Sequence, residues 1–146
     1  MDLPEELVRG QIEEGKVYRF YDSVPKGSNI IPNHWHICFK INEEIVYLVC
    51  CTTKEGTIDN YIKVNRLDTK TKVYIAPTAD NGLTKDTFLN CNSVQICDFK
   101  ELVKSISKSN VTYSGFVSKE DFDSIKIGII SSAVVPNAIK KLVLNI

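Results

Sequence analysis

The fold is decided by residues 34–53, which read HWHICFKINEEIVYLVCCTT. Along His34–Ile41 the side chains alternate with a period of two, which is typical of a strand that turns one face to the core. That core face carries Trp35, Ile37, Phe39 and Ile41. After a tight connection at residues 42–44, the run Ile45–Thr53 is apolar until its two threonines, as in a central strand covered on both faces. These two strands predict the middle of a β-sheet.

Segments on both sides of this pair extend the sheet. Further strands are expected over Lys16–Tyr21, Tyr61–Val64, Lys72–Ile75 and Ser93–Ile96. A long turn-rich loop of residues 22–33 follows the first of them. Long ordered loops in small domains tend to have a function, so this loop is a candidate part of a site.

Helices are expected near both ends of the chain. Pro4–Glu14 has a proline suited to a first helical position and an apolar stripe. Capping-box spacings predict two more helices, after Asp98 and after Ser118, and a last one is expected from Pro136 to the end. The length of residues 1–146 fits one domain. Short strands followed by helices predict a mainly β domain, a small barrel with short N-terminal and C-terminal helices.

The charge balance excludes a general attraction to nucleic acid. The chain has 18 basic and 18 acidic residues, so its formal net charge is zero, and any RNA binding must rest on a local patch. No apolar run approaches the roughly 20 residues needed to cross a bilayer. The acidic start Met1–Glu6 lacks the pattern of a secretory signal. We therefore expect a cytoplasmic protein with no membrane partner.

The cysteines form no recognisable framework. Their count is five, none is part of a C-x-x-C pair, and Cys50 and Cys51 lie inside an apolar strand, where thiols behave as small hydrophobic groups. We expect all five to be reduced, with a metal or redox role as the alternative. The sequence predicts no cofactor and no metal.

The sharpest chemical feature is the pair His34 and His36, the only two histidines of the chain. Residues two apart on a strand share a face, so we expect both imidazoles opposite Trp35 and about 7 Å apart. Imidazoles carry protons at cellular pH. Two of them would supply the base and the acid for attack of an RNA 2′-hydroxyl on the adjacent phosphorus without a metal. Two other interpretations stay open: polar caps on an exposed strand, and a zinc site that includes Cys38.

Two further places suit a phosphate. Thr52 and Thr53 end the central strand, where a hydroxyl is well placed to donate to a phosphate oxygen, although threonine is also an ordinary strand residue. In the long loop, Lys26 and Ser28 flank a glycine and offer a charge and free backbone amides. A solvated loop explains these loop residues equally well.

The order of these pieces resembles the MazF/PemK-like toxin family, small SH3-like barrels that cut single-stranded RNA without a metal. Gly15–Phe20 is similar to the family's opening Gly-Asp-Ile-Tyr strand, and His34–Phe39 to its second strand. Ile45–Thr53 resembles its third strand, which ends in Thr-Ser or Thr-Thr. Asn92–Ile96 and Gly115–Glu120 resemble its Ser-Val-Val strand and the Gly-x-Leu-Ser-x-Glu entry to its last helix. The resemblance implies an SH3-like/PemK-like β-barrel.

The same resemblance implies a function. It implies a metal-independent endoribonuclease, the toxin of a toxin–antitoxin or phage-defence pair, with single-stranded RNA as substrate, an antitoxin protein as partner and a homodimer as the assembly. The family's catalytic arginine before the second strand has no arginine counterpart here, and we expect His34 to take its place. The expected catalytic residues are His34, His36, Thr52 and Thr53, and the expected RNA-binding residues are Arg19, Lys26 and Ser28.

A non-catalytic interaction module on the same barrel is the alternative. It would bind a protein or a nucleic acid without cutting it. The missing arginine and the zero net charge favour this alternative, whereas the paired histidines favour the enzyme.

Overall fold

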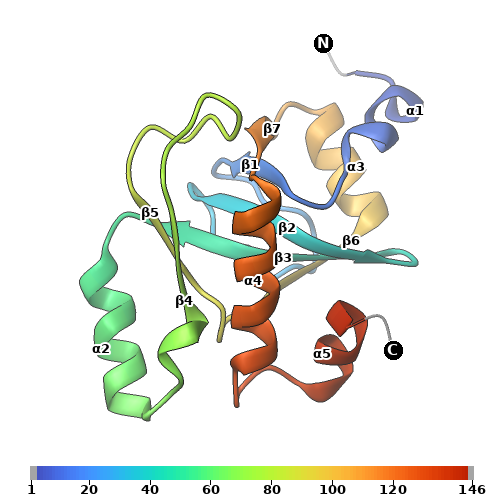
Figure 1. Ribbon diagram of the computed structural model, residues 1–146. Helices are drawn as coiled ribbons and strands as arrows, with labels where there is room; N and C mark the ends of the chain where they lie inside the picture. The colour runs from blue at the N-terminus through green and yellow to red at the C-terminus, as the bar shows by residue number, and fades with distance from the viewer. Residues whose placement is uncertain (1–2, 145–146) are drawn as a thin grey trace.

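The computed structural model describes residues 3–144 and centres on a seven-stranded sheet (Figure 1). Every strand pair is antiparallel. The strands lie in the order β4-β5-β3-β2-β1-β7, and β6 pairs with the first half of β3. Their bounds are β1 (Lys16–Phe20), β2 (Trp35–Asn42), β3 (Ile45–Thr52), β4 (Lys72–Ile75), β5 (Thr87–Asn90), β6 (Gln95–Asp98) and β7 (Val111–Phe116).

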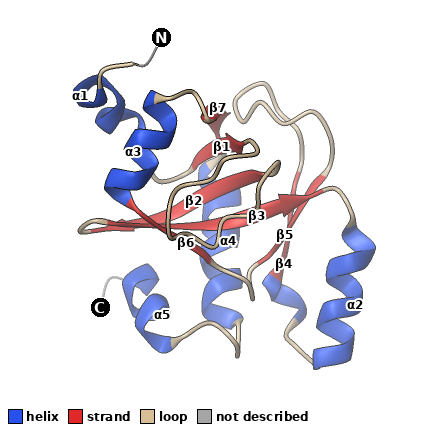
Figure 2. Ribbon diagram, turned by 180° about the vertical axis from the view of Figure 1, so that it is seen from behind, coloured by secondary structure: helices blue, strands red, loops and turns tan. Residues whose placement is uncertain are grey.

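Helices cover the sheet on both sides. Over residues 3–144 they are α1 (Glu5–Val8), α2 (Glu55–Asn65), α3 (Phe99–Ser107), α4 (Lys119–Ser131) and α5 (Asn137–Leu144). α4 lies in front of the sheet in Figure 1 and behind it in Figure 2, whereas α3 packs with α1 against the opposite face. None of these helices has the length and apolar character needed to traverse a membrane.

The central strands are buried on both faces, in two separate cores. One core holds Val17 and Ile37 together with residues of α4 and α5. The other core holds the alternate residues Tyr18 and Leu48 together with residues of α1 and α3. Residues 36–39 of β2 therefore have no solvent-facing side. Burial on both faces also explains the continuous apolar run of β3.

The sheet is not closed into the expected barrel, which corrects the predicted fold. In the part of the chain that the structure describes, the end strands β4 and β7 do not pair. Instead the loop of residues 76–86 reaches β7, where the Phe116 N–H donates to the Asp80 carbonyl at 2.8 Å. A Cβ at Gly115 would lie 1.9 Å from that carbonyl oxygen, so only glycine permits the approach. The fold is mixed α/β, with the expected terminal helices present as α1 and α5.

Most of the other predicted elements are confirmed. β1, β2, β3, β4 and β6 lie within two residues of their predicted bounds. The Asp98 carboxylate accepts the first free N–H groups of α3, and the Ser118 hydroxyl does the same for α4. The first helix is shorter than predicted, because α1 ends at Val8 and a 3₁₀ turn follows to Gln11. The last two residues of the final predicted helix lie outside the described residues.

The strand predicted at Tyr61–Val64 is wrong, because this segment belongs to helix α2. Ile58 and Ile62, one helical turn apart, are its buried residues, and Lys72 of β4 forms an ion pair with Glu55 of α2 at 2.7 Å. A four-residue run of aromatic and β-branched residues is too short for its period to separate strand from helix. Strands β5 and β7 are additions that the sequence pattern does not predict.

Candidate functional site

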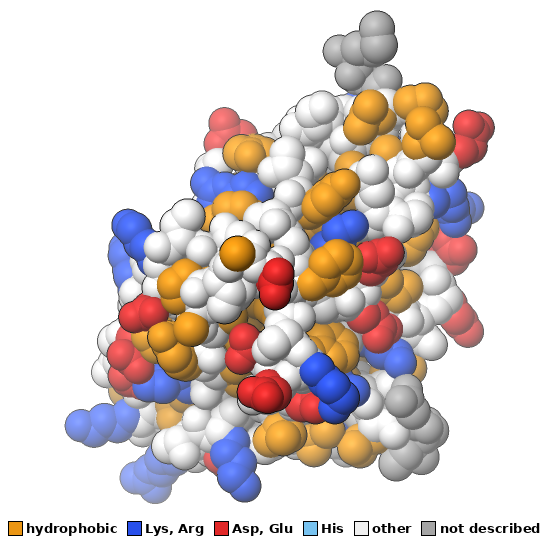
Figure 3. All heavy atoms as spheres, turned by 45° about the horizontal axis from the view of Figure 1, so that its top comes forward, with side chains coloured by type: hydrophobic (Ala, Val, Ile, Leu, Met, Phe, Trp, Pro, Cys, Tyr) orange, Lys and Arg blue, Asp and Glu red, His pale blue; other side chains and the backbone are white. Residues whose placement is uncertain are grey.

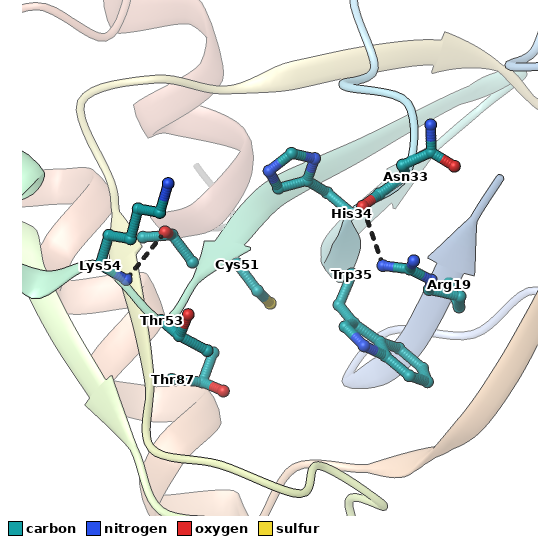
Figure 4. Close-up of a pocket in the computed structure, with 9 residues that line it drawn as sticks. Arg19, Asn33, His34, Trp35, Cys51, Thr53, Lys54 and Thr87 are labelled. Atoms are coloured by element: carbon teal, nitrogen blue, oxygen red, sulfur yellow. Dashed lines mark hydrogen bonds between the residues drawn. The ribbon is translucent and has the colours of Figure 1, made fainter. Parts of the chain in front are cut away.

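A pocket of about 250 Å³ opens where β3 ends and β2 begins (Figure 4). The pairing of β1 with β2 and of β2 with β3 assembles it, since Arg19 lies opposite Trp35 and His36 opposite Cys50. The residues that line it are Arg19, Asn33, His34, Trp35, Cys51, Thr52, Thr53, Lys54 and Thr87. Of the predicted site residues, the structure brings four together here: Arg19, His34, Thr52 and Thr53.

His34 stands at the rim of this pocket, immediately before β2. Its Nδ1 lies 2.9 Å from the carbonyl oxygen of Pro32. A carbonyl only accepts hydrogen bonds, so Nδ1 must be the protonated nitrogen. The neutral ring then keeps its lone pair on Nε2, and the imidazole is set up as a proton acceptor.

Hydroxyl groups and a lysine occupy the opposite side of the pocket, as Figure 4 shows for Thr53, Thr87 and Lys54. The Thr52 Oγ1 accepts the Lys54 N–H at 3.1 Å. That bond uses an oxygen lone pair, so the hydroxyl proton of Thr52 remains available to a ligand. The Thr87 hydroxyl donates to the Lys85 carbonyl at 3.0 Å and is left as an acceptor. This side therefore offers hydrogen-bond donors and a positive charge.

Arg19 of β1 supplies a second positive charge beside His34. Its Nη1 donates to the Asn33 carbonyl at 2.9 Å, which ties the guanidinium to the residue that precedes His34. Asn33 has a left-handed backbone with φ of 61°, a conformation that asparagine adopts more easily than most residues. Its side-chain amide donates to Asp22 at 2.8 Å. The rim of the pocket is thus held in place by contacts from three segments.

His36 does not reach the pocket, which corrects the prediction of two imidazoles on one open face. Its side chain is fully buried, with the ring edge-on to Phe20 at 5.0 Å. Its Nε2 accepts the Ile31 N–H at 3.4 Å, and its Nδ1 lies 3.3 Å from the His34 carbonyl oxygen. Burial lowers the pKa of His36 from 6.5 to about 4. It is a neutral structural residue that fastens the loop to β2.

Lys26 and Ser28 also lie away from this pocket. The Ser28 hydroxyl donates to the Pro25 carbonyl at 2.8 Å, and Lys26 lines a separate pocket against α3. The loop that carries them is fastened to the sheet, because the side chain of Asn29 accepts the Ile96 N–H at 2.7 Å. Their predicted contribution to RNA binding at the His34 site is not supported by this arrangement.

Cys51 lies in the pocket but is not a nucleophile at neutral pH. Burial raises the pKa of its thiol well above the usual value, so the reactive thiolate is not formed. The zinc alternative is not supported either, since His36 and Cys38 face the buried core whereas His34 faces the pocket. No group of three or more histidine, cysteine, aspartate or glutamate side chains in residues 3–144 is arranged to hold a metal ion.

Several pocket residues were not predicted from the sequence. The alternation of His34–Ile41 places Trp35 on the core face. Asn33 belongs to the long loop that is a candidate part of a site, but it is not among the expected site residues. Lys54 directly follows the strand-end threonines and could have been found from that position. Thr87 belongs to β5, a strand with no clear pattern of its own.

Comparison of the chain with protein-family models finds no match, and comparison with curated proteins finds none either. The functional assignment therefore rests on the chemistry of the pocket.

Proposed function

We propose that this protein is a metal-independent endoribonuclease that cuts single-stranded RNA in the pocket at His34. The observation that carries the proposal is the convergence of an imidazole with a free Nε2, strand-end hydroxyls and two cations on one solvent-reachable pocket. A phosphodiester bears a negative charge and its cleavage needs a base. Arg19 and Lys54 complement the negative charge, and His34 is the base.

The reaction begins with proton transfer from the RNA 2′-hydroxyl to Nε2 of His34. The 2′-oxygen then forms a bond to the adjacent phosphorus, and the bond from phosphorus to the 5′-oxygen breaks. The products are a 2′,3′-cyclic phosphate and a 5′-hydroxyl. The leaving oxygen takes its proton from water, because the second imidazole, that of His36, is buried away from the pocket.

The charge that develops on the phosphorane oxygens is met by the two sides of the pocket. Thr52 has a hydroxyl proton to donate, and Lys54 and Arg19 supply positive charge from opposite sides (Figure 4). Fixed donors aimed at developing charge are among the larger contributions to catalysis. Arg19 is fixed by its bond to the Asn33 carbonyl.

We further infer that the chain is a divergent MazF/PemK-like toxin, with an antitoxin protein as partner and a homodimer as its assembly. The likeness in sequence order supports this, and so does Arg19, which holds a guanidinium next to the residue before His34. A cation from β1 would then serve where the family has an arginine before its second strand. The unclosed sheet, bridged by the loop of residues 76–86, would be a variant of the SH3-like barrel.

The test is incubation of the purified full chain with a long single-stranded RNA in excess chelator, followed by mapping of the cut ends. The expected products carry 2′,3′-cyclic phosphates and 5′-hydroxyls. The control is the His34→Ala variant, purified in the same way, which should leave the RNA intact and so exclude a contaminating ribonuclease.

RNA that stays intact under these conditions, or that is cut equally by His34→Ala, would contradict the proposal. Intact RNA that is nevertheless bound would favour the non-catalytic interaction module, which the zero net charge of the chain also allows. On the face drawn in Figure 3, basic and acidic side chains are interspersed.

A further inference from the structure

The wall of the pocket opposite the threonines is aromatic. Trp35 is half-buried and packs against the core shared with α4, yet it also lines the pocket. Figure 4 shows its indole and the Arg19 guanidinium on one side of the cavity, across from Thr53 and Thr87. The pocket therefore has one wall with a flat indole and a guanidinium, and one wall of hydroxyl groups and a lysine.

Arg19 extends the aromatic wall towards the surface. Its guanidinium carbon lies 5.8 Å from the centre of the Trp35 ring and 5.6 Å from that of Tyr21. Tyr21 is 42% exposed. A planar cation between two rings makes a continuous surface for flat groups, because guanidinium and aromatic faces both stack on π-systems.

A nucleotide has the two properties that the two walls would complement. Its phosphate is an anion that accepts hydrogen bonds, and its base is a flat ring whose faces stack on aromatic side chains. With the phosphate placed between His34 and Lys54, the base attached to the same sugar would reach the wall formed by Trp35. Core packing accounts for the buried part of the indole, but Trp35 is only half-buried and also lines the pocket.

We propose that Trp35 is the platform on which the nucleobase beside the scissile phosphodiester stacks, with Arg19 and Tyr21 continuing the surface to the next base. The inference rests on the proposed function, since it takes RNA as the ligand. It also gives a physical reason for the single-stranded substrate. In a duplex both faces of a base are covered by its neighbours, so only an unpaired nucleotide can present a face to Trp35.

Trp35 is the only tryptophan of the chain, so its fluorescence reports on this wall alone. The probe is a single-stranded 2′-O-methyl oligoribonucleotide, which has no free 2′-hydroxyl and is not cut by the proposed route. Titrating it into the full chain should quench the fluorescence, and inorganic phosphate or the same oligonucleotide as a duplex should not. Removing single bases from the probe should identify one position whose loss weakens binding about 10-fold.

Variants test the platform directly, with binding followed through a dye on the oligonucleotide. Trp35→Leu should weaken binding about 10-fold or more, whereas Trp35→Phe should keep most of the affinity because phenylalanine still stacks. The matched control is Tyr61→Leu, which removes an exposed aromatic ring on α2 that does not line the pocket. It should bind as the natural chain does.

Unchanged affinity in folded Trp35→Leu, or equal quenching by the duplex, would overturn the inference and leave Trp35 as core packing. If Trp35→Leu fails to fold, the quenching by single strand against duplex still decides, because it uses the natural chain. The two proposals can fail separately. Quenching by the single strand without cleavage of ordinary RNA would refute the nuclease alone. Cleavage by the natural chain, together with unchanged RNA binding by folded Trp35→Leu, would refute the platform alone.

Discussion

The two histidines of this chain lie two residues apart and have opposite environments. His34 precedes β2, lines an open pocket, and has one ring nitrogen hydrogen-bonded to the Pro32 carbonyl. His36 lies within β2, is fully buried, and has both ring nitrogens in contact with the backbone of the loop. The strand end places one imidazole at the pocket, and the strand interior buries the other against the loop.

The difference shows that the chemistry of a residue depends on what covers its face of the sheet. The face of β2 that carries His36 is covered by the loop of residues 22–33, whose Ile31 N–H donates to the ring, and the core on that side also includes residues of α1 and α3. His34, just before the strand, lines the pocket instead. In the proposed reaction the base must reach the substrate, and of the two histidines it is His34 that lines the pocket. Variants at the two rings separate their roles.

The largest effect is expected for His34→Gln. Glutamine keeps a hydrogen-bonding side chain but cannot accept and return a proton at neutral pH, so RNA cleavage should fall about 10²- to 10⁴-fold. The free energy of unfolding should change by less than about 0.5 kcal/mol, because the site is open to solvent. Single-turnover cleavage and urea unfolding measure the two quantities. A variant that cuts normally would remove His34 from the mechanism.

Acid should destabilise the protein through His36. The unfolded chain binds a proton at this ring below pH 6.5, whereas the buried ring resists protonation down to about pH 4. The stability contributed by the neutral buried ring is therefore complete above pH 6.5 and is lost as the pH falls towards 4, by about 3 kcal/mol. Urea unfolding across this range measures it. Equal pH dependence in natural chain and His36→Leu would show that His36 is not the cause.

His36→Leu should also destabilise the protein at neutral pH, by about 2 kcal/mol. The Ile31 N–H loses its acceptor, whereas the His34 carbonyl keeps a bond from the Phe20 N–H at 3.1 Å. Cleavage should fall less than in His34→Gln, since only the position of the loop is disturbed. Urea unfolding at pH 7.5 gives the first value. If His36→Leu were as stable as the natural chain but lost as much cleavage as His34→Gln, the roles assigned to the two rings would be reversed.

Thr52→Val should have the smallest effect, about a 10-fold loss of cleavage. Valine has the shape of threonine without the hydroxyl that we assign to a phosphorane oxygen, and Lys54 and Thr53 remain beside it. The rate of a single turnover at saturating RNA is the measurement. The matched control is Thr57→Val, a threonine of α2 that does not line the pocket, and it should cut at the natural rate.

Much of the sheet could be predicted from local pattern. The alternation of His34–Ile41 and the apolar run of Ile45–Thr53 carry clear periods, and both strands are present within one residue of their predicted bounds. The capped helices α3 and α4 could be predicted equally well, because the capping residues Asp98 and Ser118 mark their starts in the sequence. Both kinds of feature depend on neighbours in sequence.

The positions of His36 and Thr87 depend on contacts between different segments of the chain, which local pattern does not reveal. A strand covered on both faces, as expected for β3, implies a covered neighbour in β2, yet the alternation of His34–Ile41 indicates an open face for His36. That face is covered by Phe20 of β1 and by the loop of residues 22–33, and the core on that side also includes residues of α1 and α3. The same holds for Thr87, which reaches the pocket only because β5 pairs with the end of β3.

In the proposed reaction the RNA's own 2′-hydroxyl attacks the phosphorus after giving its proton to His34. The deciding measurement compares two oligonucleotides that differ at one nucleotide, the one on the 5′ side of the mapped cut. The all-ribose strand should be cut there, and the strand with a single 2′-deoxyribose at that position should stay intact at the same site. Cleavage of both strands at equal rates would contradict the account.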